Sequence, residues 1–289
     1  MIEWYYLVII SALLNGISQI IEKKLLKVEH SLAFSTTVTA GVALISLILI
    51  PFASVPANSA QWLSILAFSA TLALSYWLAA RLYRHGNISI AAPMYNVLPI
   101  LFVVIGAFIF LSEVLTIGNY AAILVIVAAA YLMFSEVNKI KKSEHTIKMY
   151  KRLIFAATLI TAANLIILKY ALLSINIYTL LIVTSILTAV FLFFEILGKS
   201  SAYREKMISA IRGNATTLIF MAVLTVSYRV LFYLAVSGAA ISLATPLNSA
   251  IVLVLTVVPS GIMFGEKRLR QKILLSAIML IAMYFLIAA

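Results

Sequence analysis

Residues 88–93 read ISIAAP, and residues 241–246 read ISLATP, 153 positions later (88 to 241). A glutamate follows each proline at the same distance, Glu113 after Pro93 and Glu266 after Pro246. The offset is about half of the 289-residue chain. The sequence therefore predicts two copies of one structural unit.

The composition excludes a soluble globular protein. Some 64% of the residues are apolar, 10% are charged, and the mean hydropathy is +1.14. A soluble domain carries about 25% charged residues to cover its surface. The chain is therefore expected to be an all-α integral membrane protein, because helices satisfy their own backbone groups in lipid. The absence of cysteine excludes disulfides, thiolate metal sites and cysteine nucleophiles.

Ten apolar stretches are long enough to be candidate transmembrane helices, since about 20 residues cross a bilayer core. They cover residues 4–22, 32–53, 61–82, 88–110, 117–136, 153–171, 177–197, 214–236, 241–263 and 271–288.

Basic residues collect in alternate connections between these spans. All but two of the 21 Lys and Arg residues fall on one side, the exceptions being Lys169 and Arg229. By the positive-inside rule, this side is expected to be cytoplasmic in the cell membrane, which leaves both termini outside. The net charge of +12 is then explained by topology and by anionic lipid headgroups rather than by nucleic acid.

An odd number of spans in each copy means that the second copy enters the membrane in the opposite direction. The predicted organisation is a first repeat over residues 1–136, a basic cytoplasmic linker over 137–152, and a second repeat over 153–289. Inverted repeats are typical of secondary transporters, whose sites lie near the bilayer midplane between the repeats.

The chain resembles the EamA-type branch of the drug/metabolite transporter superfamily. The motifs that carry the resemblance are Pro93 with Ser112-Glu113 and Pro246 with Gly265-Glu266. The resemblance implies ten helices in two inverted five-helix repeats and a carrier that moves small metabolites by alternating access. Bacterial members often have cytoplasmic termini, whereas the charges here predict the reverse. Small multidrug members use a glutamate within their first helix, but the middle of span 1 holds no acid.

Two polar helix faces are candidates for contact with a solute. Asn15 and Gln19 recur every four residues in span 1, and Asn164 stands on a comparable face of span 6. Amides donate and accept hydrogen bonds, which suits a zwitterionic or polyol solute. The alternative is that they form hydrogen bonds between helices.

Arg229, beside Tyr228, is the one clear charge inside a predicted span. A guanidinium there could bind a carboxylate or phosphate bidentately. The alternative is that the long side chain extends to the membrane interface. If the anchoring role holds, the solute carries an anionic group.

The remaining candidates for contact with a solute are aromatic residues and residues beside prolines. Tyr76 and Trp77 in span 3 either line a pathway or pack between helices. Pro93 and Pro246 are predicted helix breaks, because proline removes one helical hydrogen bond. Polar residues stand beside both prolines, namely Tyr95, Asn96, Asn248 and Ser249.

Glu113 and Glu266 each precede the next span and are expected to cap it or fix its turn. No catalytic, nucleotide-binding or metal-binding motif is present, so we expect neither an enzyme, a cofactor nor a metal site.

The leading hypothesis is a secondary transporter that moves a small polar or amphiphilic metabolite, an amino acid or an organic anion, with export favoured by the resemblance. Its expected partners are the solute and membrane lipids; the sequence does not indicate an oligomeric state. The alternative is a flippase for a lipid-linked substrate.

Overall fold

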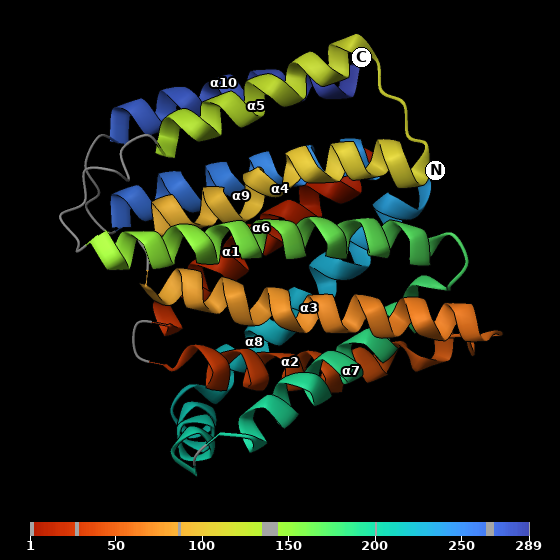
Figure 1. Cartoon of the computed structure of the whole chain (residues 1–289), viewed down its shortest axis with the longest axis vertical. Coiled ribbons are helices and arrows are strands. Elements are labelled where there is room, and N and C mark those ends of the chain that lie inside the picture. The colour runs from red at the N-terminus through yellow and green to blue at the C-terminus, as the bar shows by residue number, and fades with distance from the viewer. Residues whose placement is uncertain are drawn as a thin grey trace.

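The computed structural model describes residues 3–26, 29–85, 88–134, 144–199, 201–263 and 269–288. Within these ranges the chain forms ten α-helices and one 3-10 helix, and no strand (Figure 1). Their bounds are α1 Trp4–Leu25, α2 Ser31–Ser46, η1 Leu47–Phe52, α3 Ser59–His85, α4 Ile88–Leu111, α5 Ile117–Phe134, α6 Glu144–Leu172, α7 Ile177–Leu197, α8 Ser201–Gly238, α9 Ile241–Met263 and α10 Leu269–Ala288.

Each of the ten predicted spans falls on a helix. In the described part of the chain, six helical stretches are long and apolar enough to cross a membrane. Helices α4, α5, α9 and α10 contribute shorter apolar stretches there. Helix α6 begins at Glu144, so the last residues of the predicted linker are helical; residues 137–143 lie outside the described ranges.

Helix α8 is longer than the span predicted for it. Its backbone leaves the helical region at Asn214 (φ −135°, ψ 23°), where the predicted span begins. In Figure 1 the segment before this kink, at the lower left, runs across the direction of its neighbours. The Asn214 side chain donates a hydrogen bond to Glu29 at 3.1 Å, which ties the kink to the connection between α1 and α2.

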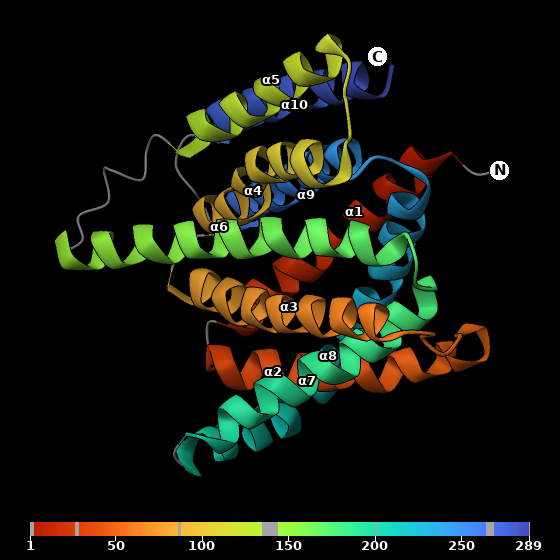
Figure 2. The ribbon, with the colours of Figure 1, turned by 45° about the vertical axis from the view of Figure 1, so that its right-hand side comes forward.

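The helices pack in pairs that repeat between the two halves of the chain. Helix α1 packs against α8 and α9, and α6 packs against α3 and α4. Helices α4 and α9 lie side by side, as do α5 and α10 (Figures 1 and 2). Replacing each helix by the one five places along the chain leaves this pattern unchanged. Glycines permit close approach, because a Cβ on Gly106 of α4 would come within 2.1 Å of Ile166 on α6.

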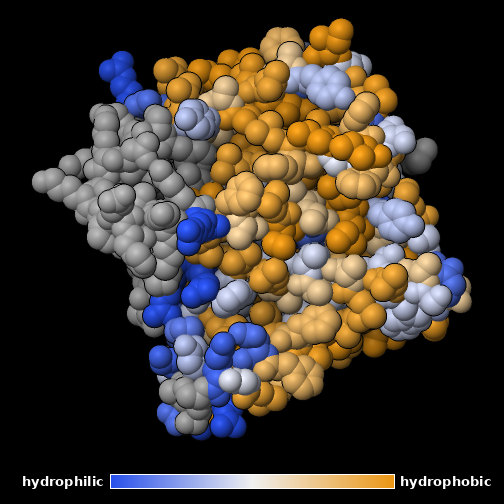
Figure 3. Space-filling view, viewed as in Figure 1, coloured by the Kyte–Doolittle hydropathy of each residue, from blue (hydrophilic) through white to orange (hydrophobic). Residues whose placement is uncertain are grey.

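The outer surface of the bundle is apolar. Figure 3 shows hydrophobic residues over its middle and strongly hydrophilic residues gathered at the left margin. Ile117 and Phe110 are 87% and 72% exposed, which suits a surface covered by lipid rather than water.

The end of α4 is closed by a strained residue. Ser112 has φ 54°, in the left-handed region that glycine adopts most readily. This turn brings the N–H of Glu113 to within 3.1 Å of the Ala107 carbonyl oxygen. In the other copy of the motif, the corresponding residue is Gly265, which lies outside the described residues.

Glu113 caps a helix, but not the one that follows it. Its carboxylate accepts hydrogen bonds from the N–H groups of Ile241 and Ser242, both at 3.0 Å, and from the Ser242 hydroxyl. The expected cap of the next span is therefore wrong, because the carboxylate lies at the N-terminus of α9 in the other half. Lys169 of α6 donates to the carbonyl oxygens of Val236 and Ala239 at the end of α8. Glu266 lies outside the described residues.

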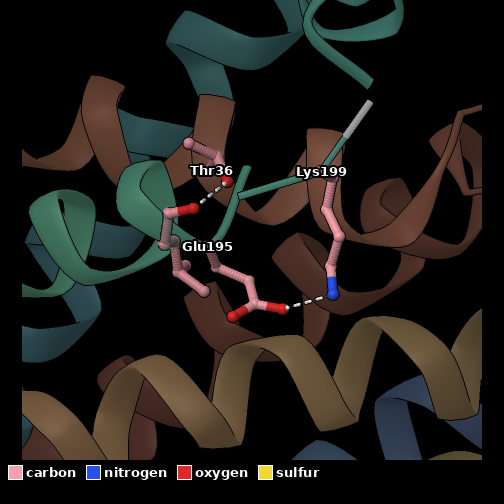
Figure 4. A network of polar contacts seen from close by, with 4 residues as sticks. Thr36, Glu195 and Lys199 are labelled. Atoms are coloured by element: carbon pink, nitrogen blue, oxygen red, sulfur yellow. Dashed lines mark hydrogen bonds and ion pairs between the residues drawn. The ribbon is translucent and has the colours of Figure 1, made fainter. Parts of the chain in front are cut away.

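Surface charges form weaker contacts. Glu195 and Lys199 pair at 3.1 Å on α7 and the residues after it, and both side chains are nearly half exposed (Figure 4). Such a pair contributes about 0–1 kcal/mol. It offers a control for the buried cap.

Replacing Ser112 by glycine is expected to stabilise the protein by about 0.5–1 kcal/mol, because glycine relieves the left-handed strain. Thermal unfolding in detergent would measure this gain. Ser112→Ala keeps the unfavourable φ and should give no gain. Equal midpoints for the glycine and alanine variants would contradict the assignment of strain.

Replacing Glu113 by alanine is expected to destabilise the protein by about 2 kcal/mol, because it leaves the first N–H groups of α9 without their charged acceptor. Thermal unfolding again provides the measurement. Glu195→Ala removes the same charge from the exposed pair and should change the midpoint little. If the two variants behaved alike, the cap would have no special role.

Candidate functional site

A cavity of about 180 Å³ lies inside the bundle. Helices α1, α2, α3, α4, α6, α8 and α9 line it. It brings together all but one of the proposed solute-contacting residues, namely Asn15, Gln19, Tyr76, Tyr95, Asn96, Asn164, Tyr228, Arg229, Asn248 and Ser249.

Trp77 is the exception and does not line the cavity. The Arg81 guanidinium lies 4.7 Å from the centre of its ring instead. Trp77 also packs against the buried cluster of Leu32, Ala73, Leu192 and Ile196. The structure therefore supports packing, rather than pathway lining, for Trp77.

Arg229 is buried at the centre of this arrangement, with 5% of its surface exposed. Its guanidinium donates a hydrogen bond to the Tyr76 hydroxyl at 2.8 Å and lies 5.2 Å from the Tyr76 ring centre. The side chain does not extend to the membrane interface. Because a guanidinium has five N–H donors, the bond to Tyr76 leaves others for an anion.

Tyr76 and Arg229 stand at matching positions of the duplicated sequence pattern. They are 153 residues apart, which is the offset of the duplicated proline motif. The contact therefore joins a residue to its own counterpart across the middle of the molecule. A strict application of the repeat offset would have identified this pair from sequence.

Helix α8 is fixed beside α1 by a hydrogen bond next to Arg229. The Ser11 hydroxyl donates to the carbonyl oxygen of Tyr228 at 2.8 Å. This bond sets the height of Arg229 along α1. The polar face of span 1 therefore helps to position the charge on α8.

Gln19 is held by protein partners on every side. Its carbonyl oxygen accepts from the Tyr83 hydroxyl at 2.9 Å and from the Asn96 amide at 3.0 Å. Its amide nitrogen lies 3.3 Å from Asn15 Oδ1 and 3.2 Å from Asn96 Oδ1. This amide cluster joins α1, α3 and α4. For Gln19, hydrogen bonding between helices describes the contacts better than solute binding.

Asn164, in the second half of the chain, also forms hydrogen bonds between helices. Its amide nitrogen donates to the Phe68 carbonyl oxygen at 3.1 Å and to the Thr71 hydroxyl at 2.9 Å. These bonds tie α6 to α3. Asn164 therefore borders the cavity, but its amide hydrogens are bonded to α3.

Other lining atoms are available to a solute. Among the described residues, the Ser75 hydroxyl, the Thr245 hydroxyl and Asn248 Oδ1 are buried without a hydrogen-bond partner in the protein. Buried polar atoms are almost always paired in folded proteins. Unpaired atoms beside a cavity thus indicate positions where a bound molecule would supply the partner.

Neither predicted proline break divides its helix. Helix α4 runs through Pro93 and α9 runs through Pro246 without interruption. Pro246 is buried near the start of α9, where Glu113 already holds the preceding turn. The prolines remove one backbone donor each, but the helices continue because their remaining bonds and packing hold them.

Sequence reasoning missed an acidic residue at the cavity. Glu22 lines it and is partly buried. The acid was overlooked because only the middle of span 1 was considered, whereas the cavity follows α1 to its last turn. The spacing gives the signal: Glu22 follows Gln19 by three residues and Asn15 by seven, so all three share one helix face.

Aromatic rings form much of the remaining wall. Phe34, Phe68, Tyr83, Phe232 and Tyr233 line the cavity in addition to the tyrosines already named. No group of histidine, cysteine, aspartate and glutamate in the described part of the chain could hold a metal ion. The site thus combines apolar rings, a buried cation, hydrogen-bonding atoms and a carboxylate.

Comparisons with known proteins show a similarity to one transporter family over the first part of the chain. Residues 2–135 match the EamA-like transporter family. No curated protein matches the chain in sequence. A solved structure titled only "Crystal structure of protein" is similar with a TM-score of 0.73 and 10% identity, over 98% of this chain and 97% of that chain; at this identity, the likeness shows the fold alone. The match and the long apolar helices point to a multi-pass membrane protein whose residues 2–135 are similar to the EamA-like transporter family of the drug/metabolite transporter superfamily.

Proposed function

We propose that the chain is a secondary transporter for a small polar or amphiphilic metabolite that carries an anionic group, such as an amino acid or an organic anion. The observation that carries this proposal is the buried guanidinium of Arg229 in the wall of the cavity. A charge inside a membrane bundle is costly, and such residues commonly mark a solute pathway.

The binding step would exchange one partner of Arg229 for another. In the structure the guanidinium bonds to the Tyr76 hydroxyl. An entering carboxylate or phosphate would accept two hydrogen bonds from the guanidinium. This charge-assisted pair is stronger than a hydrogen bond to a neutral phenol. Asn248 Oδ1 and the Thr245 hydroxyl would contact the polar part of the solute from α9.

Alternating access would move two inverted five-helix repeats against each other, residues 1–136 and 153–289, joined by the linker over 137–152. The helix contacts support this division, because α1 packs against α8 and α9 as α6 packs against α3 and α4. The contact of Tyr76 with its counterpart Arg229 supports an axis of pseudo-symmetry through the cavity. Carriers built in this way bind at the interface between the repeats.

The cavity is lined unequally by the two repeats. Phe34, Ser35 and Val38 of α2 contribute to it, and α1 contributes as far as Glu22. The cavity therefore extends toward the end of α1 that carries Lys23 and Lys24. We assign that end to the cytoplasm, in the cell membrane, with both termini outside and export as the direction of transport.

Arg229→Gln is expected to reduce uptake of anionic solutes into proteoliposomes at least tenfold, because a charge-assisted hydrogen bond pair is lost. A panel of radiolabelled amino acids, carboxylates and phosphate esters supplies the substrates. Arg81→Gln removes the same charge outside the cavity and should leave flux intact. Unchanged kinetics in the Arg229 variant would reject the anchoring role. No saturable flux of any solute by the unaltered protein would reject transport.

The absence of native cysteine permits a direct test of the orientation. Cysteine placed at exposed Val55 should react with an impermeant maleimide in intact cells. Cysteine placed at Lys199 should react only after the membrane is permeabilised, because the basic connections face the cytoplasm. The reverse pattern would place both termini inside.

A further inference from the structure

Two opposite charges border the cavity at different heights along α1. Arg229 follows Tyr228, whose carbonyl oxygen is bonded to Ser11. Glu22 stands at the last turn of the same helix. Among the described residues, no hydrogen bond or ion pair to the Glu22 carboxylate is found. The proposed function uses the cationic end and leaves the acidic end unexplained.

Glu22 lies in surroundings that suit an ammonium group. The Tyr83 hydroxyl is bonded to Gln19, one helical turn before Glu22. The rings of Tyr83 and Tyr95 both line the cavity, with their centres 6.1 Å apart in an edge arrangement. Aromatic faces attract cations, and a carboxylate beside them supplies the opposite charge.

The neighbouring lysine does not neutralise this acid. Lys23 donates its ammonium hydrogen to the Tyr83 carbonyl oxygen, which binds it to the backbone of α3. Lys23 and Glu22 follow one another on the helix, so their side chains point in different directions. Glu22 therefore lines the cavity, where a bound ammonium group would stabilise the charged form of its carboxyl group.

The two charged groups are separated by more than one small amino acid. Ser11 and Glu22 stand about 16 Å apart along α1, at about 1.5 Å per residue. Arg229 bonds to Tyr76 of α3, and Tyr83, which bonds to Gln19 near Glu22, follows seven residues later, about 10 Å along that helix at about 1.5 Å per residue. A carboxylate and an amine on one carbon atom cannot contact both ends.

We infer that Glu22, with the rings of Tyr83 and Tyr95, forms a cation subsite, and that the solute is an extended zwitterion. Its carboxylate or phosphate binds Arg229, and its amine binds Glu22 across an apolar chain that lies along the aromatic wall. This inference rests on the proposed transport function. It adds a requirement for a distant positive charge, which the anionic anchor alone does not impose.

The charge pattern also excludes related solutes. A dicarboxylate would bring a second negative group to Glu22 and would not supply the cation that stabilises its carboxylate. A simple fatty carboxylate would leave Glu22 without a partner in a desolvated place, which is unfavourable. Selectivity among solutes of equal length should therefore follow the charge at the far end.

Binding of three probes of equal chain length to the protein in nanodiscs tests the inference: amino-octanoate, octanoate and octanedioate, with glycine as a short zwitterion. Isothermal titration calorimetry would measure the affinities. The unaltered protein should bind amino-octanoate on the order of tenfold more tightly than octanoate, and more tightly than glycine and octanedioate. Glu22→Gln should abolish the preference for the amine while octanoate still binds.

Controls separate this inference from the proposed function. Glu3→Gln makes the same change outside the cavity and should keep the preference, and Glu22→Asp should restore it in part if Glu22→Gln folds poorly. Equal affinity for amino-octanoate and octanoate in the unaltered protein, or a preference that survives in Glu22→Gln, overturns the cation subsite alone. Loss of saturable flux for all anions would instead reject the transport function.

Discussion

A bilayer core offers no hydrogen-bonding partner to a polar group, and this constraint determines where every polar side chain of the bundle lies. The amide cluster around Gln19 and the ties of Asn164 satisfy their groups inside the protein. At the cavity, Arg229 donates a hydrogen bond to the Tyr76 hydroxyl. The same solvent that makes the outer surface apolar therefore concentrates polar chemistry into one interior space.

The proposed duplication would place the cavity between two similar halves, and sequence differences between those halves would make it asymmetric. Tyr76 and Arg229 stand 153 residues apart, the offset of the duplicated proline motif, yet one is a neutral phenol and the other a cation. A symmetric pair of arginines would repel each other in a medium of low dielectric constant. The Tyr76 hydroxyl accepts a hydrogen bond from Arg229, whereas a second arginine has no acceptor atom to offer. The difference between Tyr76 and Arg229 thus places a positive charge on one side of the cavity only at this pair of positions.

The helices and most cavity residues could be predicted because hydropathy and helical spacing record burial in a membrane directly. Three features escaped, each for a physical reason. Trp77 neighbours a cavity residue in sequence but points elsewhere on its helix. Glu22 stands at the last turn, beyond the part of the span where an acid was sought. Glu113 caps α9, a helix more than a hundred residues away, because only the folded packing brings α4 and α9 together.

The cap made by Glu113 also bears on the order of assembly. Helix α4 is synthesised well before α9. Until α9 is present, the Glu113 carboxylate, which follows α4, lacks the N–H groups of Ile241 and Ser242 that it binds in the folded protein. The first half of the chain is consequently an incomplete folding unit, and the arrival of α9 closes it. Insertion of the second half then does more than append five helices: it supplies the missing donors that complete the first half.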